Sequence, residues 1–327
     1  MAETWEGDWE AEARESVDDD RGLTPAILSA IYNYMEAVRC DHNPSQQSNL
    51  AVLQASQASK ARAETLSLSN SIINICDQTN KLQHIDLLTL TISEVEMDME
   101  HVFPVKSSWV LLPSQGLVIV CGGVRAELAS SEVLGVQLQA SLVMSLGEMT
   151  EGRWEAGIIE TADRIFVFGG LSPELKATCE SFDLATNTWL SIGNMHSARA
   201  GFTPALWKQS IILVGGLGTG NIEAYDLSQG QFHQIPLQLP YADQYTTALV
   251  TGEEMVIVQR DKLVGMSLRG GNRRVYDIAQ LEKPGWWFSP TCPVSIAADV
   301  FLLDWACDAK VWKYSSHTLV AVLSLTT

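Results

Sequence analysis

The sequence is short of positive charge. Its 327 residues include 21 lysines and arginines against 39 aspartates and glutamates, which gives a net charge of −18 at pH 7. Nonspecific binding to nucleic acid or to an anionic membrane requires a positive surface. We therefore expect neither nucleic acid nor a membrane as a partner, although the composition leaves room for a local basic patch.

Cysteine is scarce and scattered, and long apolar runs are missing. The six cysteines lie at positions 40, 76, 121, 179, 292 and 307, and no two of them form a C-x-x-C pair, so a zinc site is not expected. No apolar run approaches the length of a membrane helix, and the first residues contain no apolar segment of a secretory signal. We expect a reducing, cytoplasmic compartment.

Motifs for catalysis are also missing. The chain contains no G-x-x-x-x-G-K-[ST], no G-x-S-x-G and no H-E-x-x-H, and its six histidines do not cluster. The run GGLGTG (215–220) follows an apolar strand, but the next residues, NIEAYDL, alternate as a strand does. A phosphate-binding loop would instead open a helix. The sequence predicts no catalytic residue, no metal site and no cofactor, and hence a non-enzymatic protein.

What the sequence does contain is a repeat. An apolar strand that ends in Gly-Gly occurs as LVIVCGG, RIFVFGG and IILVGG, with the first glycine of each pair at Gly122, Gly169 and Gly215. Degenerate copies at nearly the same spacing end at Cys76, Gln259 and Asp304. Fixed-period similarity of this length is typical of repeat architectures, and the chain divides into six units of about 46 residues.

Two further features keep the same phase. Each unit continues with a short segment such as HIDL, SFDL or AYDL, and a second large side chain follows seven positions after the first in most units (Ile92, Val143, Trp189, Phe232). A shorter strand such as GFTPALW precedes the Gly-Gly strand. Each unit therefore predicts four strands, and such units stack radially as propeller blades. We expect the glycines where backbones crowd.

These motifs resemble the Kelch-repeat β-propeller family, which has a double glycine, a tyrosine-aspartate and a tryptophan about seven residues later. The best match is Arg164–Met195, and the resemblance covers roughly residues 60–327. It implies an all-β, six-bladed Kelch-type propeller that acts as a protein–protein interaction scaffold or adaptor, such as a substrate receptor. The alternative is a propeller enzyme, or a small-molecule or metal binder, that uses the central channel with loop carboxylates (Glu174, Asp304, Asp308).

The sequence predicts three regions. Residues 1–21 hold nine acidic residues and two arginines and form an acidic, disordered tail. Residues 22–60 form a helical extension, with Thr24 as N-cap and Pro25 in the first turn; this helix either packs on the propeller or binds a partner. Residues 61–327 form the propeller, with blades anchored near 76, 122, 169, 215, 259 and 304.

Loops on a rigid scaffold are the usual location of binding residues. In a propeller, the loops between the second and third strands and the loops between blades gather on one face. Here these loops contain arginines and aromatics of the kind that anchor interfaces: Arg125, Arg153, Arg199, Tyr241, Arg260 and Trp305. We expect them to bind a protein partner through an acidic peptide segment. Alternatively, Arg153 and Arg199, which are 46 residues apart, make the same ion pair between blades.

Overall fold

A computed structural model represents the protein. It describes residues 68–98, 102–240, 245–251, 253–259, 262–268, 275–280, 293–296, 298–304, 310–315 and 318–325, with the backbone alone for 275–280 and 304. The predicted acidic tail (1–21) and helical extension (22–60) lie outside these residues, so both stay predictions.

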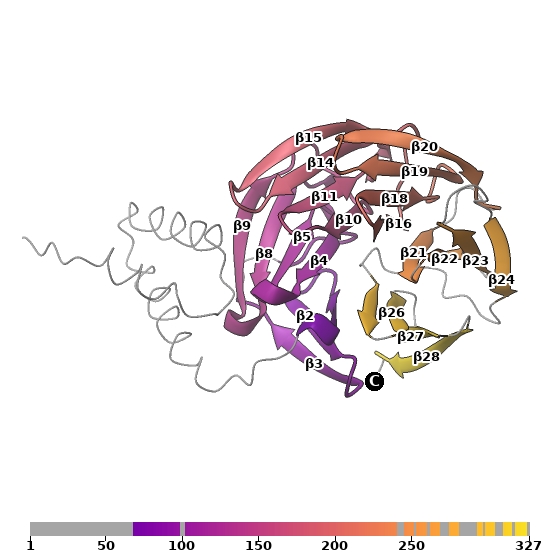
Figure 1. Cartoon of the computed structure of the whole chain (residues 1–327). Coiled ribbons are helices and arrows are strands. Elements are labelled where there is room, and N and C mark those ends of the chain that lie inside the picture. Colours follow the sequence, from indigo (N-terminus) through magenta and orange to yellow (C-terminus); the bar gives the residue numbers. More distant parts are fainter. Residues whose placement is uncertain are drawn as a thin grey trace, which may run out of the picture.

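Six of the sheets formed by the described strands are arranged around a common axis, as predicted (Figure 1), and successive strands of each pair antiparallel within its blade. We number these blades 1 to 6 in chain order. Blade 1 contains β1 (Ser71–Ile75), β2 (Lys81–Asp86) and β3 (Thr91–Glu96). Blade 2 contains β4 (Ser108–Leu112), β5 (Leu117–Cys121), β8 (Glu132–Gln137) and β9 (Leu142–Glu148). Blade 3 contains β10 (Gly157–Glu160), β11 (Arg164–Phe168), β14 (Thr178–Asp183) and β15 (Thr188–Asn194). Blade 4 contains β17 (Ala205–Trp207), β18 (Ser210–Val214), β19 (Asn221–Asp226) and β20 (Gln231–Gln238). Blade 5 contains β21 (Thr246–Thr251), β22 (Glu254–Gln259), β23 (Lys262–Ser267) and β24 (Val275–Gln280). Blade 6 contains β25 (Val294–Ile296), β26 (Asp299–Asp304), β27 (Lys310–Ser315) and β28 (Thr318–Ser324).

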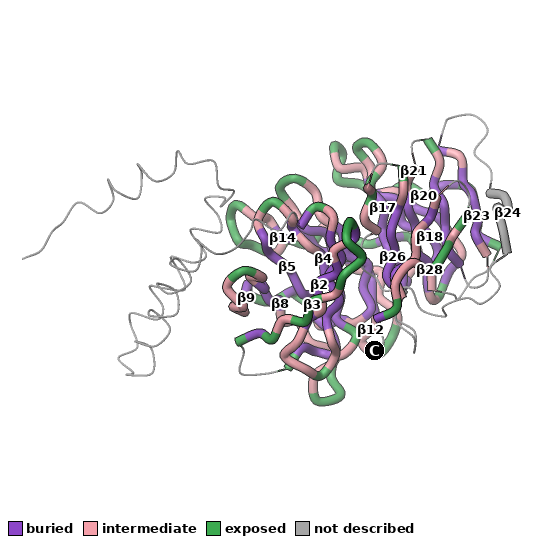
Figure 2. The backbone as a smooth tube through the Cα atoms, turned by 90° about the horizontal axis from the view of Figure 1, so that it is seen from below, coloured by how far each residue is buried: buried purple, intermediate pink, exposed green. Residues whose placement is uncertain are grey.

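Apolar clusters between the blades hold the ring together. Among the described residues, each of the six joints between neighbouring blades contains one cluster. In β18, Ile211 and Leu213 pack toward blade 3, whereas Ile212 and Val214 pack toward blade 5. Both faces of an inner strand are therefore buried (Figure 2), which explains the apolar runs. The cluster that joins blades 6 and 1 closes the ring.

The outer hairpin of a blade explains why an aspartate and two large side chains seven residues apart recur in the repeat. Asp183 Oδ1 accepts hydrogen bonds from the backbone N–H groups of Ala185 and Thr186, at 3.0 and 2.9 Å, so the aspartate stabilises the turn. Phe182 lies directly opposite Trp189 across this turn, with ring centroids 5.1 Å apart. The seven-residue spacing of large side chains is therefore a cross-strand pair.

Two blades differ from the predicted four-strand unit. The segment GFTPALW was expected to form one strand, but Pro204 has no N–H and the segment divides there. β16 (Phe202–Thr203) pairs in parallel with β21 of blade 5, whereas β17 pairs with β18 of its own blade. In blade 1, the described residues supply three strands, in the order β1-β2-β3.

Candidate interaction surface

The loops between blades and the loops between the second and third strands of a blade meet on one face of the ring. The backbone N–H of Gly123, in the loop after β5, donates to the carbonyl of Arg153, in the loop before β10, over 2.9 Å. Isolated β-bridges join the two kinds of loop at Val105–Val124, Trp154–Leu171 and Ala200–Leu217. We call the face formed by these loops the loop face. These contacts join the loops of blades 2, 3 and 4 on this face.

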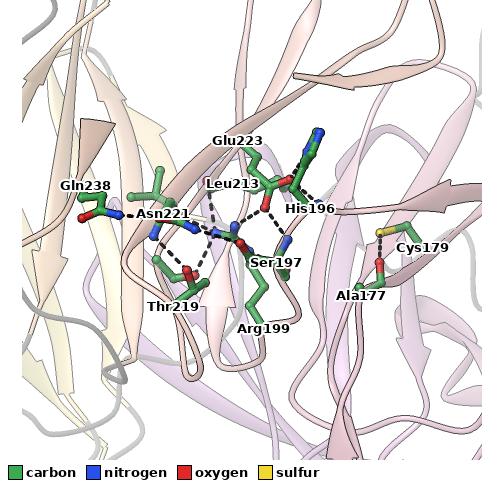
Figure 3. Close-up of polar contacts among 12 residues, drawn as sticks. Ala177, Cys179, His196, Ser197, Arg199, Leu213, Thr219, Asn221, Glu223 and Gln238 are labelled. Atoms are coloured by element: carbon green, nitrogen blue, oxygen red, sulfur yellow. Dashed lines mark hydrogen bonds and ion pairs between the residues drawn. The ribbon is translucent and has the colours of Figure 1, made fainter. Parts of the chain in front are cut away.

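Two of the predicted site residues lie beneath this surface. The side chains of Arg153 and Arg199 are 1% and 0% exposed. Arg153 Nη2 lies 2.6 Å from Glu180 Oε1 of β14, and Arg199 Nη2 donates to Glu223 Oε1 of β19 (Figure 3). The structure therefore has the alternative that the sequence left open, in which both arginines make the same ion pair. Neither side chain is accessible to a partner.

Each of these arginines also binds backbone carbonyls at the ends of two strands. Arg199 Nη1 donates to Gly215 O and Asn221 O, at 3.0 and 2.9 Å, and Arg153 Nη1 donates to Gly169 O and Thr178 O, at 2.7 and 2.8 Å. A guanidinium has several donors in a fixed plane, which suits this task. The arginine from the preceding loop thus fixes the loop face of the next blade.

The Gly-Gly motif makes room for the same loop. At Gly169 the backbone has φ +61°, and an added Cβ would lie 2.2 Å from the carbonyl oxygen of Arg199. Gly122 has the same relation to Arg153, with φ +64° and the same 2.2 Å approach. A side chain would therefore be strained in conformation and would collide with backbone. The glycine pair and the arginine are two parts of one joint between blades.

The ion pairs had a signal in the sequence that the prediction missed. Strand registers align Glu180 and Glu223 with Leu134 in blade 2 and Val264 in blade 5. The positions that correspond to Arg153 and Arg199, one repeat of 46 residues before and after them, are Ser107 before blade 2 and Tyr245 before blade 5. Arginine and glutamate therefore occur together or are absent together, as expected for partners in a buried pair.

A second cluster connects three blades at the mouth of the central channel. Glu155, which is buried, accepts from Lys106 Nζ at 2.9 Å and from the hydroxyl of Tyr245 at 2.8 Å. Burial and the adjacent Glu155 carboxylate raise the pKa of Tyr245, so the phenol stays a donor. Backbone hydrogen bonds follow the same path, from Glu155 N to Lys106 O and from Gly201 N to Glu155 O. Side-chain and backbone hydrogen bonds therefore join the loops that precede blades 2, 3 and 5.

The accessible part of the loop face includes a hairpin of blade 2. β6 (Val124–Arg125) pairs with β7 (Leu128–Ala129), and both turn residues have positive φ, as hairpin turns prefer. Leu128 at its tip is 72% exposed. Arg125 is partly exposed, and its Nε lies 3.0 Å from Glu132 Oε2. Arg125 is thus the predicted site residue that the structure places at the surface.

The remaining predicted residues lie partly outside and partly within the described part of the chain. Tyr241, Arg260 and Trp305 lie outside the described residues, as do Asp308 and the side chain of Asp304. Glu174 is exposed in β13 (Glu174–Leu175), which pairs with β12 (Leu171–Ser172) in a hairpin after β11. In the part of the chain that the structure describes, no three His, Cys, Asp or Glu side chains gather as metal ligands would. Within the same part, no helix has the length and hydropathy needed to cross a membrane.

Comparison with known proteins adds two findings. A family model described as the Kelch motif matches residues 155–196, which form blade 3 and its flanking loops. A protein of Arabidopsis thaliana named as an F-box/kelch-repeat protein is 24% identical over 144 residues. That alignment covers 43% of this chain and 57% of the relative, so the chain spans little more than half the relative's length.

Proposed function

We propose that this protein is a non-enzymatic scaffold or adaptor that binds a protein partner on its loop face. The chain is a Kelch-repeat β-propeller, and propellers of this type typically mediate protein–protein interactions. The observation that carries the proposal is the contrast within that face. Buried ion pairs hold its base, while the apolar side chain of Leu128 is 72% exposed on it. Apolar and arginine side chains on rigid loops are suited to anchoring a partner.

The proposed contact centres on the blade 2 hairpin. Leu128 would insert into an apolar site of the partner, and Arg125 beside it would bind an acidic residue of the partner segment in place of Glu132. Tyr241, Arg260 and Trp305 stay candidate contacts from the other loops. Arg153 and Arg199 are left out of this surface because their side chains are buried; they position the loops instead.

The test is affinity purification with three forms of the full chain. We expect the wild type to recover a partner that Arg125→Glu/Leu128→Asp binds at least tenfold more weakly, because the variant removes the apolar anchor and reverses the charge. Leu88→Asp is the matched control. Leu88 is 64% exposed in the turn between β2 and β3, at the opposite end of the blades, so this variant should bind as the wild type does.

Mass spectrometry identifies the partner, and titration with purified partner measures the change. Both substitutions lie on an exposed hairpin, so all three forms should unfold at the same temperature. Equal recovery of the same proteins by all three forms would contradict the placement of the site on the loop face.

A further inference from the structure

A cavity of about 210 Å³ lies within the ring, toward the end opposite the loop face. Its position follows from Glu160, which pairs with Ile165 near the start of β11, whereas the loop face follows the end of that strand. The cavity is lined by Leu68, Ser69, Ser71, Ile72, Ile73, Trp109, Val110, Leu111, Pro113, Glu160, Pro293, Val294 and Ser295. These residues come from blades 1, 2, 3 and 6, so the cavity belongs to the central channel.

The cavity lies beside the inner edge of blade 1. In the five other blades, an inner strand pairs with the strand that corresponds to β1. Among the described residues, β1 has β2 as its one strand neighbour. The indole Nε1 of Trp109 donates to the carbonyl of Ile73 over 2.8 Å and so satisfies one group of this edge. The remaining space is bounded largely by apolar side chains.

One carboxylate faces this space. Glu160 Oε2 is buried and has no hydrogen-bond partner among the described residues. The strand registers align Glu160 with Leu111, Leu206, Val250 and Ser295 of other blades, so no requirement of the fold explains an acid here. Among the described residues, the lining contains no other ionisable side chain. Beyond it, His84 Nε2 contacts Ser71 Oγ at 2.8 Å, and burial lowers the pKa of His84, so this imidazole does not supply a cation for Glu160.

We propose that this cavity binds an alkylammonium group on an aliphatic stem, with the Glu160 carboxylate as its counter-ion. A buried carboxylate is favourable when it is paired with a cation that also fills its hydrogen-bond capacity. The apolar walls suit the methylene stem, which prefers to leave water. The volume is below the roughly 300–1,000 Å³ of sites for drug-sized ligands, so the cavity takes one stem. The same chemistry is present in a free alkylamine and in a lysine side chain of a polypeptide.

The test is a titration of the full chain, labelled with ¹³C at isoleucine methyls so that Ile72 and Ile73 report binding in the cavity. The probes are n-pentylamine, the neutral 1-pentanol and a lysine capped at both backbone ends. We expect n-pentylamine to bind at least tenfold more tightly than 1-pentanol at pH 8, and Glu160→Gln to abolish this preference. Glu174→Gln, an exposed acid on the loop face, is the matched control and should keep it.

Acidity gives an independent readout. Burial raises the pKa of Glu160 to about 7, so roughly one carboxyl in ten is ionised at pH 6. Because the cation requires the ionised form, the affinity for n-pentylamine should fall about tenfold from pH 8 to pH 6. The affinity for 1-pentanol should not fall.

The two sources of the cation are distinguished by the probes. Binding of the capped lysine as tight as that of n-pentylamine supports a polypeptide ligand, and binding of n-pentylamine alone supports a free amine. The proposal is overturned if neither amine shifts the Ile72 and Ile73 methyls, or if Glu160→Gln binds the amines as the wild type does. Neither result affects the proposed role of the loop face, which is tested with other variants.

Discussion

Arg199→Met is expected to destabilise the protein by about 3–5 kcal/mol, as removal of one partner from a buried ion pair does. The substitution leaves the Glu223 carboxylate, which is 0% exposed, without its guanidinium. It also removes the donor to the carbonyls of Gly215 and Asn221. Chemical unfolding in urea, followed by far-ultraviolet circular dichroism, measures the loss. The loop face should loosen as well, because this arginine joins it to β18 and β19.

The matched control is Arg164→Met. Arg164 Nη2 also pairs with an acid, Asp183 Oδ2 at 3.3 Å, but its side chain is 37% exposed, and exposed pairs contribute about 0–1 kcal/mol. The double variant Arg199→Met/Glu223→Leu should recover part of the loss, because blades 2 and 5 form the same joint with neither charge. If Arg199→Met costs no more than Arg164→Met, the ion pair does not hold the joint.

The repeat could be predicted from the sequence because each of its motifs has a local physical cause. A Cβ added at Gly169 would lie 2.2 Å from a backbone oxygen, the aspartate stabilises a turn at Asp183, and the aromatics pair across that turn at Trp189. Such causes recur at a fixed period and survive in degenerate copies. Blade number and fold class followed from that phase, and the six sheets confirm them.

The candidate site was less predictable, because exposure depends on the partner of a side chain and not on its type. Arg125, Arg153 and Arg199 all lie in loops on the same face, yet two of them are buried. What separates them is a glutamate 24 to 27 residues later on the third strand of the blade. Arg125 instead pairs with Glu132, which is the first residue of β8 and lies seven residues later, and it stays partly exposed. Comparing the repeats for both positions together would have distinguished them.

The cavity had no signal of its own in the sequence. Glu160 is the last residue of a four-residue strand, and a polar residue at a strand end is ordinary. Its setting is unusual because Leu111, Pro113 and Ser295, from two other blades, surround the same space. Those residues are about 50 and 135 positions away in the sequence, so the ring alone brings them together.

The buried carboxyl predicts how stability depends on pH. Burial raises the pKa of Glu160 to about 7 in the folded protein, whereas an unfolded glutamate has a pKa of about 4.3. Between these values the folded state binds more protons than the unfolded state, so this group makes stability fall as pH rises from about 4.5 to 7. Glu160→Gln cannot ionise, and it should therefore be more stable than the wild type at pH 8, by about 3.5 kcal/mol. At pH 5, where the unfolded glutamate is mostly ionised and the folded one is protonated, the difference should be only about 1 kcal/mol.

Urea unfolding of both proteins at pH 5 and pH 8 gives the free energy of unfolding of the variant relative to the wild type at each pH. Asp77, whose pKa burial raises to about 6, contributes in the same direction but is present in both proteins, so its contribution cancels. Glu174→Gln, at an exposed position, should track the wild type at both pH values. Parallel behaviour of Glu160→Gln and the wild type would mean that the folded protein does not hold a proton on Glu160 at neutral pH. A growing advantage of the variant above pH 6 would show that the channel contains a carboxyl whose ionisation destabilises the fold until a cation neutralises it.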